Sequence, residues 1–151
     1  MSRSALEEIL TSMPTFGRRH ALPNSKLRAE IELAERNPAT ALATLYEMKQ
    51  LGMSPKAGWW NIEWREALAQ ALSMAGRFDE AANVHEEMLG IYRGHKLSHY
   101  DLGKIYEEMG RAADAEQQYV AFLEAWAEAD EGLPQLEDAK RRLAALRPAI
   151  Q

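Results

Sequence analysis

Two histidines, His95 and His99, stand four residues apart, the spacing at which two imidazoles on one helix could bind a metal ion. His95 directly follows a glycine, near where a helix must begin, and no third ligand is specified nearby. His85 precedes two glutamates but lacks the second histidine of a zinc protease motif. Helical spacing places His85 in a core instead. We therefore expect no metal site, and we interpret His95 and His99 as ordinary loop and helix-start residues.

Other signatures of catalysis are weak. Acidic pairs such as Glu63 and Glu66 carry the side chains of acid–base chemistry, but any acidic helical protein contains many of them. The chain has 0 cysteines, so it can form neither a disulfide framework nor a thiolate metal site. It also lacks a glycine-rich phosphate loop and a nucleophile elbow. The sequence predicts a protein that is not an enzyme and that binds no cofactor.

Two segments of the chain repeat one pattern at a distance of 34 residues. The shared offsets carry a leucine, a Gly-Arg pair and an alanine: Leu68, Gly76, Arg77 and Ala81 in one copy, Leu102, Gly110, Arg111 and Ala115 in the other. Apolar residues recur at three and four on both sides of each glycine, which predicts two amphipathic helices per copy. The glycine stands where a left-handed residue lets the first helix end and the chain reverse.

A helix-turn-helix unit with this period resembles the tetratricopeptide repeat. The resemblance covers about residues 24–129 and is strongest from residue 62 onward. The segment 119–134 and the helix after it also resemble the tail of many bacterial domains of this type. The resemblance implies an all-α fold, a right-handed α-solenoid of antiparallel helix pairs with seven to eight helices.

We expect one domain over residues 1–151, built from a few segments. These are an N-terminal helix and loop (1–23), a degenerate repeat (24–52), an insertion (53–61), two regular repeats (62–95 and 96–129) and a C-terminal capping helix (130–151). In the degenerate repeat, a helix from Asn24 should turn Leu27, Ile31 and Ala34 inward. In the capping helix, Lys140, Arg141 and Arg142 should face outward.

Ligands of this family usually lie in a concave groove lined by the first helices of successive repeats. Transferred by offset, the groove residues of this chain are Lys26, Glu30, Glu63, Glu66, Gln70, Ser73, Leu97, Tyr100, Lys104 and Glu107. Tyr100 is expected to be an exposed aromatic contact. Glu66 and Gln70 replace the lysine and asparagine of the variant that grips C-terminal carboxylates, so we do not expect that specificity. The alternative is that these residues form solvated polar helix faces without a ligand.

Three of the four tryptophans lie together at Trp59, Trp60 and Trp64. Large apolar residues at helical spacing usually belong to a core, so one interpretation places them between the irregular first repeat and the regular second one. The other interpretation leaves Trp59 or Trp60 partly exposed as a binding platform, since tryptophan is frequent at binding hot spots.

The charge of the chain bears on its partners. The net charge of −5 disfavours nucleic acid and anionic lipid, and no apolar run is long enough for a membrane span. We expect a cytoplasmic adaptor that binds a peptide or helix of another protein in its groove. The alternative is a self-associating or secretion-chaperone-like module that uses its N-terminal helix and Trp-rich edge, with a possible weak homodimer.

Overall fold

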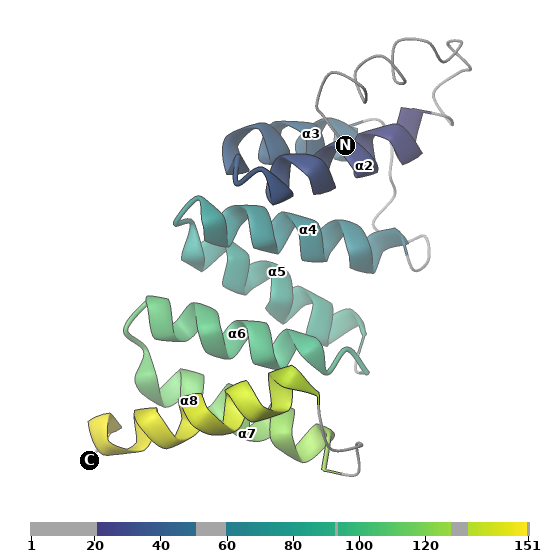
Figure 1. The fold of residues 1–151 in the computed structure, drawn as a ribbon. Helices are drawn as coiled ribbons and strands as arrows, with labels where there is room; N and C mark the ends of the chain where they lie inside the picture. The colour runs from purple at the N-terminus through teal and green to yellow at the C-terminus, as the bar shows by residue number, and fades with distance from the viewer. Residues whose placement is uncertain (1–20, 51–59, 93, 128–132, 151) are drawn as a thin grey trace. The chain divides into compact units, whose positions relative to one another are not determined.

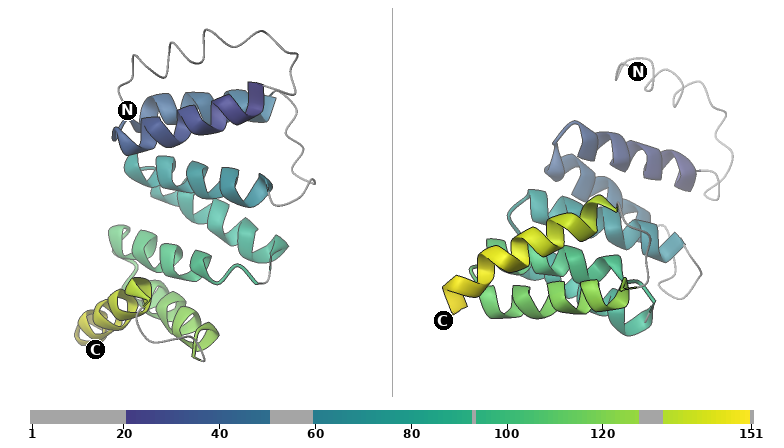
Figure 2. Two further views of the ribbon diagram at one scale, coloured as in Figure 1. Left: turned by 45° about the vertical axis from the view of Figure 1, so that its right-hand side comes forward. Right: turned by 60° about the horizontal axis from the view of Figure 1, so that its bottom comes forward.

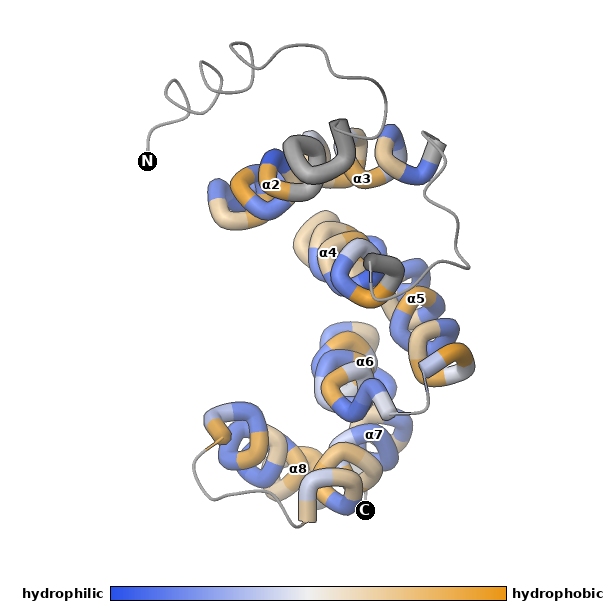
Figure 3. Tube along the Cα trace, turned by 90° about the vertical axis from the view of Figure 1, so that its right-hand side faces the viewer, coloured by the Kyte–Doolittle hydropathy of each residue, from blue (hydrophilic) through white to orange (hydrophobic). Residues whose placement is uncertain are grey.

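The computed structural model describes residues 21–50, 60–92, 94–127 and 133–150, and these ranges contain seven α-helices and no strand (Figure 1). The helices are α2 (Ala21–Ala34), α3 (Pro38–Gln50), α4 (Trp60–Met74), α5 (Phe78–Ile91), α6 (Leu97–Glu108), α7 (Ala112–Ala125) and α8 (Pro134–Ile150). Each helix carries both hydrophobic and hydrophilic residues (Figure 3). The prediction of an all-α fold is confirmed.

The chain divides into two compact units, residues 1–67 and residues 68–151. The division falls within α4, and each unit is described by itself. Residues 1–20, which include the expected N-terminal helix, lie outside the described residues, as does the insertion up to residue 59. Helix α4 begins at Trp60, two residues before the expected start of the second repeat.

The same turn ends the first helix of each repeat. Gly76 and Gly110 have left-handed backbones, with φ of 73° and 72°, as the repeat predicts. Arg36 occupies the equivalent offset in the first copy and also has a positive φ, 57°. In the last copy, the Gly110 amide donates to Glu107 O at 2.9 Å, and the next amide donates to Tyr106 O at 2.8 Å. Both other copies repeat this pair of bonds, which satisfies the last carbonyls of the helix.

In the first unit, α2 packs against α3, with a buried face that differs from the expected one. Helix α2 starts at Ala21, inside the expected loop, and buries Ala29 and Leu33. Leu27, expected inward, is 44% exposed. The prediction of the buried face was wrong, because this face contains the small Ala29. Ala29 lies at the offset of Ala69 and Gly103 in the other copies, where a small residue allows the helices to approach closely.

Trp64 of α4 donates from Nε1 to the carbonyl oxygen of Leu45 at 3.0 Å. Leu45 is buried in the middle of α3. This contact favours the core interpretation for Trp64, because a half-buried indole with a satisfied N–H is typical of packed tryptophan. Trp59 and the side chain of Trp60 lie outside the described residues.

In the second unit, α6 packs against α5 and α7, and α8 packs against α7 (Figures 1 and 2). The core between these helices contains Ala81, Met88, Leu102, Ile105, Tyr106, Ala115, Tyr119, Phe122, Leu136, Ala139 and Leu143. The repeat offsets therefore point inward, as the sequence predicts. This stack sets the positions of the side chains on α6 and on the first turns of α8.

His85 is a core residue, as predicted, and is 5% exposed. Its Nδ1 lies 3.2 Å from the hydroxyl oxygen of Ser98, which is itself buried. Burial lowers the pKa of His85, and the nearby Asp101 opposes that effect. A neutral imidazole with a hydrogen-bond partner is the form that a core accepts.

Candidate partner-binding face

Four of the predicted groove residues lie on α6 at spacings of three or four and form what we call the α6 face: Leu97, Tyr100, Lys104 and Glu107. All four are half-buried. Residues three and four apart share one side of a helix, so the sequence alone places them together. Helix α8 reaches the same side of α6, where Asp138 contacts Tyr100 and Arg142 contacts Glu107.

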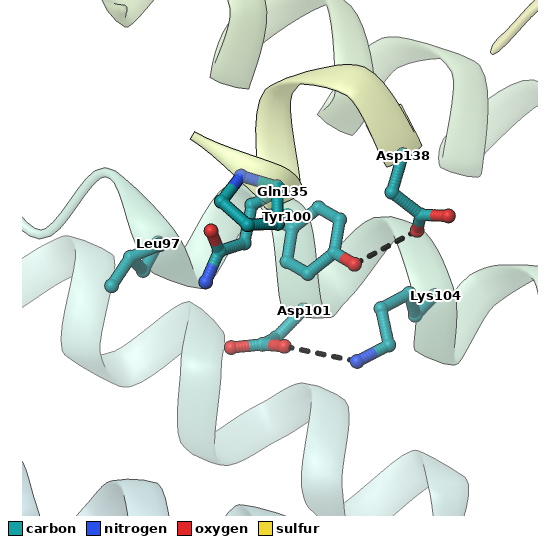
Figure 4. A pocket seen from close by; sticks show the side chains of 7 residues that line it. Leu97, Tyr100, Asp101, Lys104, Gln135 and Asp138 are labelled. Carbon is teal, nitrogen blue, oxygen red and sulfur yellow. Dashed lines mark hydrogen bonds and ion pairs between the residues drawn. The ribbon is translucent and has the colours of Figure 1, made fainter. Parts of the chain in front are cut away.

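Tyr100 is fixed from two sides. Its ring packs on Phe122 and Tyr119, with centroid distances of 5.4 and 6.3 Å. Its hydroxyl donates to Asp138 Oδ2 at 2.8 Å (Figure 4). Burial and this carboxylate raise the pKa of Tyr100 to about 12. The expectation of an exposed Tyr100 was wrong, because the capping helix brings Asp138 against it.

Glu107 also bonds to neighbouring helices. It accepts a hydrogen bond from the Tyr119 hydroxyl on α7 and another from Arg142 Nη1 on α8, the latter at 3.2 Å. Burial and Glu107 raise the pKa of Tyr119. Arg142 was expected to face outward with its basic neighbours, and this expectation was wrong. The side chain turns towards α6 because two carboxylates, Glu107 and Asp138, lie within its reach.

Asp138 joins α8 to the α6 face. It accepts hydrogen bonds from Arg142 Nε at 2.6 Å, from Tyr100 and from Arg141. These donors hold the pKa of Asp138 well below its usual range. The spacing of Asp138 and Arg142, four residues apart on a predicted helix, was the available sequence signal for this pair.

A hollow of about 460 Å³ opens between the start of α6 and the start of α8 (Figure 4). Its lining residues are Leu97, Tyr100, Asp101, Lys104, Pro134, Gln135 and Asp138. Three of these belong to the predicted groove set. Sequence reasoning missed the other four, because a repeat offset gives no information on which face a capping helix covers. The volume is within the range of small-ligand sites.

The remaining groove candidates are spread over the two units. Glu30 is exposed on α2, and Glu63 and Glu66 are half-buried on α4 in the first unit. Gln70 is exposed and Ser73 half-buried in the second unit. The side chain of Lys26 lies outside the described residues. The role of these residues in binding stays a prediction.

The histidine pair has protein partners. His95 Nδ1 lies 2.8 Å from the Ser98 hydroxyl oxygen, and His99 Nδ1 lies 2.8 Å from Gln118 Oε1. Within the described ranges, no three histidine or carboxylate side chains gather as metal ligands would.

Among the residues that the structure describes, no helix combines the length and the apolar character needed to cross a bilayer.

Comparison with known proteins bears on this architecture. Residues 72–125 match the family model of the tetratricopeptide repeat. The fold is similar to the crystal structure of the type III secretion translocator chaperone SycD of Yersinia enterocolitica, in an alternative dimer. The TM-score is 0.74 at 14% identity, over 87% of this chain and 96% of that one. A search of curated proteins gave no match.

The family model thus covers the end of α4, all of α5 and α6, and α7 to its last residue. These are the helices in which Gly76 and Gly110 end the first helix of a pair, and in which Ala81 and Ala115 are buried early in the second. The predicted resemblance to the tetratricopeptide repeat is confirmed over residues 72–125, where the family model matches.

Proposed function

We propose that this chain is an adaptor that binds a peptide or helix of a partner protein on the α6 face and in the hollow beside α8. The observation that supports the proposal is the hollow itself, in which Leu97, Tyr100 and Lys104 of α6 meet residues of α8. Repeat proteins of this type act as interaction scaffolds. We propose that this chain is cytoplasmic and that its groove binds a protein partner.

The lining of the hollow suits a protein ligand. Leu97 and Pro134 supply apolar surface, the Tyr100 ring is held rigidly, and charged groups of both signs stand at the rim. A rigid aromatic group contributes contact area at low entropic cost, whereas rim charges set orientation and association rate. Helix-in-groove and extended-peptide recognition both use such a combination.

The test combines capture with mapping. The full chain is used to capture its partner from the native cell, and hydrogen exchange of the purified complex is compared with that of the free chain. The proposal predicts new protection on α6 (residues 97–108) and the start of α8 (residues 134–138). Protection confined to α5 and α7 would contradict it, as would an absence of any bound protein.

A second candidate is the self-associating, secretion-chaperone-like module. It is favoured by the similarity to SycD, whose crystal structure is described as an alternative dimer. Light scattering at micromolar concentration separates the two candidates. A monomer supports the adaptor, and a tight dimer that is weakened by Trp60→Ala supports self-association through the Trp-rich edge.

A further inference from the structure

Two side chains that line the hollow, Gln135 and Asp101, carry acceptor oxygens that are incompletely satisfied. Gln135 Oε1 is buried and has no hydrogen-bond partner among the described residues. The Asp101 carboxylate, 39% exposed, pairs only with Lys104 Nζ in the described part of the chain, at 3.5 Å. The Tyr100 ring adds an electron-rich face beside them (Figure 4). A buried acceptor without a donor is costly, so the hollow suits a ligand that brings N–H groups.

Lys104 already places a cation beside Tyr100 and Asp101. Its ammonium lies 5.0 Å from the centroid of the Tyr100 ring and 3.5 Å from Asp101 Oδ1. Charge-assisted hydrogen bonds are usually about 2.7–2.9 Å long, so the pair with Asp101 is loose. An exposed pair of this kind contributes little to stability, and Lys104 can therefore give way to a better-fitting cation.

We propose that the hollow between α6 and α8 binds an arginine side chain of the partner's peptide. The planar guanidinium can stack on the Tyr100 ring, pair with Asp101 and donate to Gln135 Oε1, because it carries five donors in a fixed fork. Its aliphatic stem lies along Leu97 and Pro134. This inference rests on the proposed function and adds the chemical class of the ligand to it.

A positively charged guest side chain and a negatively charged one predict opposite effects of Lys104→Gln on binding. If a guest arginine enters the hollow, Lys104→Gln removes a competing cation and strengthens binding. If the hollow instead held an acidic side chain, Lys104 would be its partner and the same substitution would weaken binding. Asp101→Asn should weaken binding of an arginine peptide about tenfold, the usual effect of losing a hydrogen bond to a charged group. Glu137→Gln is the matched control, since Glu137 is exposed on α8 and does not line the hollow.

The experiment uses a random dodecapeptide library displayed against the full chain. The strongest binder is then resynthesised, also with citrulline in place of each arginine, and titrated against wild type, Asp101→Asn, Lys104→Gln and Glu137→Gln. Circular dichroism checks that each variant is folded. We expect arginine-rich binders, about tenfold weaker binding by Asp101→Asn and by the citrulline peptide, tighter binding by Lys104→Gln and no change by Glu137→Gln.

Four other outcomes overturn the inference. Binders without basic residues, or binding that Lys104→Gln weakens, refute the arginine site while leaving the proposed function intact. Free arginine amide that binds as tightly as the peptide places the site with small molecules rather than with a protein partner. A library that yields no binder refutes the proposed function and the inference together.

Discussion

Gly103 of α6 lies directly against the ring of Tyr119 of α7: a Cβ atom at residue 103 would stand 2.5 Å from Cε1 of that ring. Tyr119 is fully buried and cannot move aside. In the second copy the same two offsets hold Ala69 and His85, a slightly larger residue opposite a smaller ring. The two repeats therefore fill the same gap between their helices with different pairs of side chains, the smaller residue standing opposite the larger ring.

Gly103→Ala should lower the free energy of unfolding by about 1–3 kcal/mol, because the added methyl overpacks the contact with Tyr119. Gly90→Ala is the control, since a Cβ there meets no atom within 4 Å. That substitution, inside α5, should stabilise the protein by about 0.5–1 kcal/mol. Urea denaturation measures both effects. Equal midpoints for the two variants would show that α6 and α7 do not approach as described.

At the left-handed turns, substitutions at the equivalent positions 36 and 110 should change stability in opposite directions. Arg36→Gly should stabilise the protein by about 1 kcal/mol, because a side chain with φ of 57° is strained. Gly110→Ala should destabilise it by about 1–2 kcal/mol for the same reason, since a Cβ at residue 110 touches nothing within 4 Å. Thermal denaturation checks both. A loss of stability in Arg36→Gly would contradict the assignment of three equivalent turns.

His85 should make stability depend on pH near neutrality. Burial lowers its pKa in the folded chain, whereas the unfolded chain keeps the ordinary value of 6.5. The unfolded state therefore binds more protons, and the contribution of His85 is complete above pH 6.5 and is lost as the pH falls below it. His85→Leu, which installs the residue type of Leu45 at the same offset, should lose less stability between pH 7.5 and about 5.5. A loss of stability over this pH range in His85→Leu equal to that of wild type would contradict this account of His85.

Asp138 should make the stability of the folded chain depend on pH in more acidic solution. The donors Arg142, Tyr100 and Arg141 depress its folded pKa, whereas the unfolded carboxyl keeps its ordinary value of 3.8. Its contribution is therefore present above about pH 4 and is lost as the pH falls towards the folded pKa. Urea unfolding at about pH 6 and pH 3 should show a smaller difference for Asp138→Asn than for wild type. A difference as large as that of wild type would show that the hydrogen bonds of Asp138 do not stabilise the folded chain.

The sequence predicted the architecture because the repeat encodes it locally. The offsets of Leu102, Gly110 and Ala115 determine a helix, a turn and a close contact without reference to distant residues. The covering of the α6 face by α8 was not predictable in this way. The run from Lys140 to Arg142 has the pattern of a solvated surface, and only the packing of α8 on α7 brings Arg142 to Glu107.

Site-specific photo-crosslinking in the native cell tests the central claim most directly. A photoreactive residue replaces Leu97 at the rim of the hollow, and in a matched variant it replaces Gln117, which is exposed on α7. The account predicts a crosslinked peptide of one partner protein at position 97 and none of that partner at position 117. Crosslinking of the partner at position 117 alone would contradict the claim that the α6 face and its hollow form the binding surface.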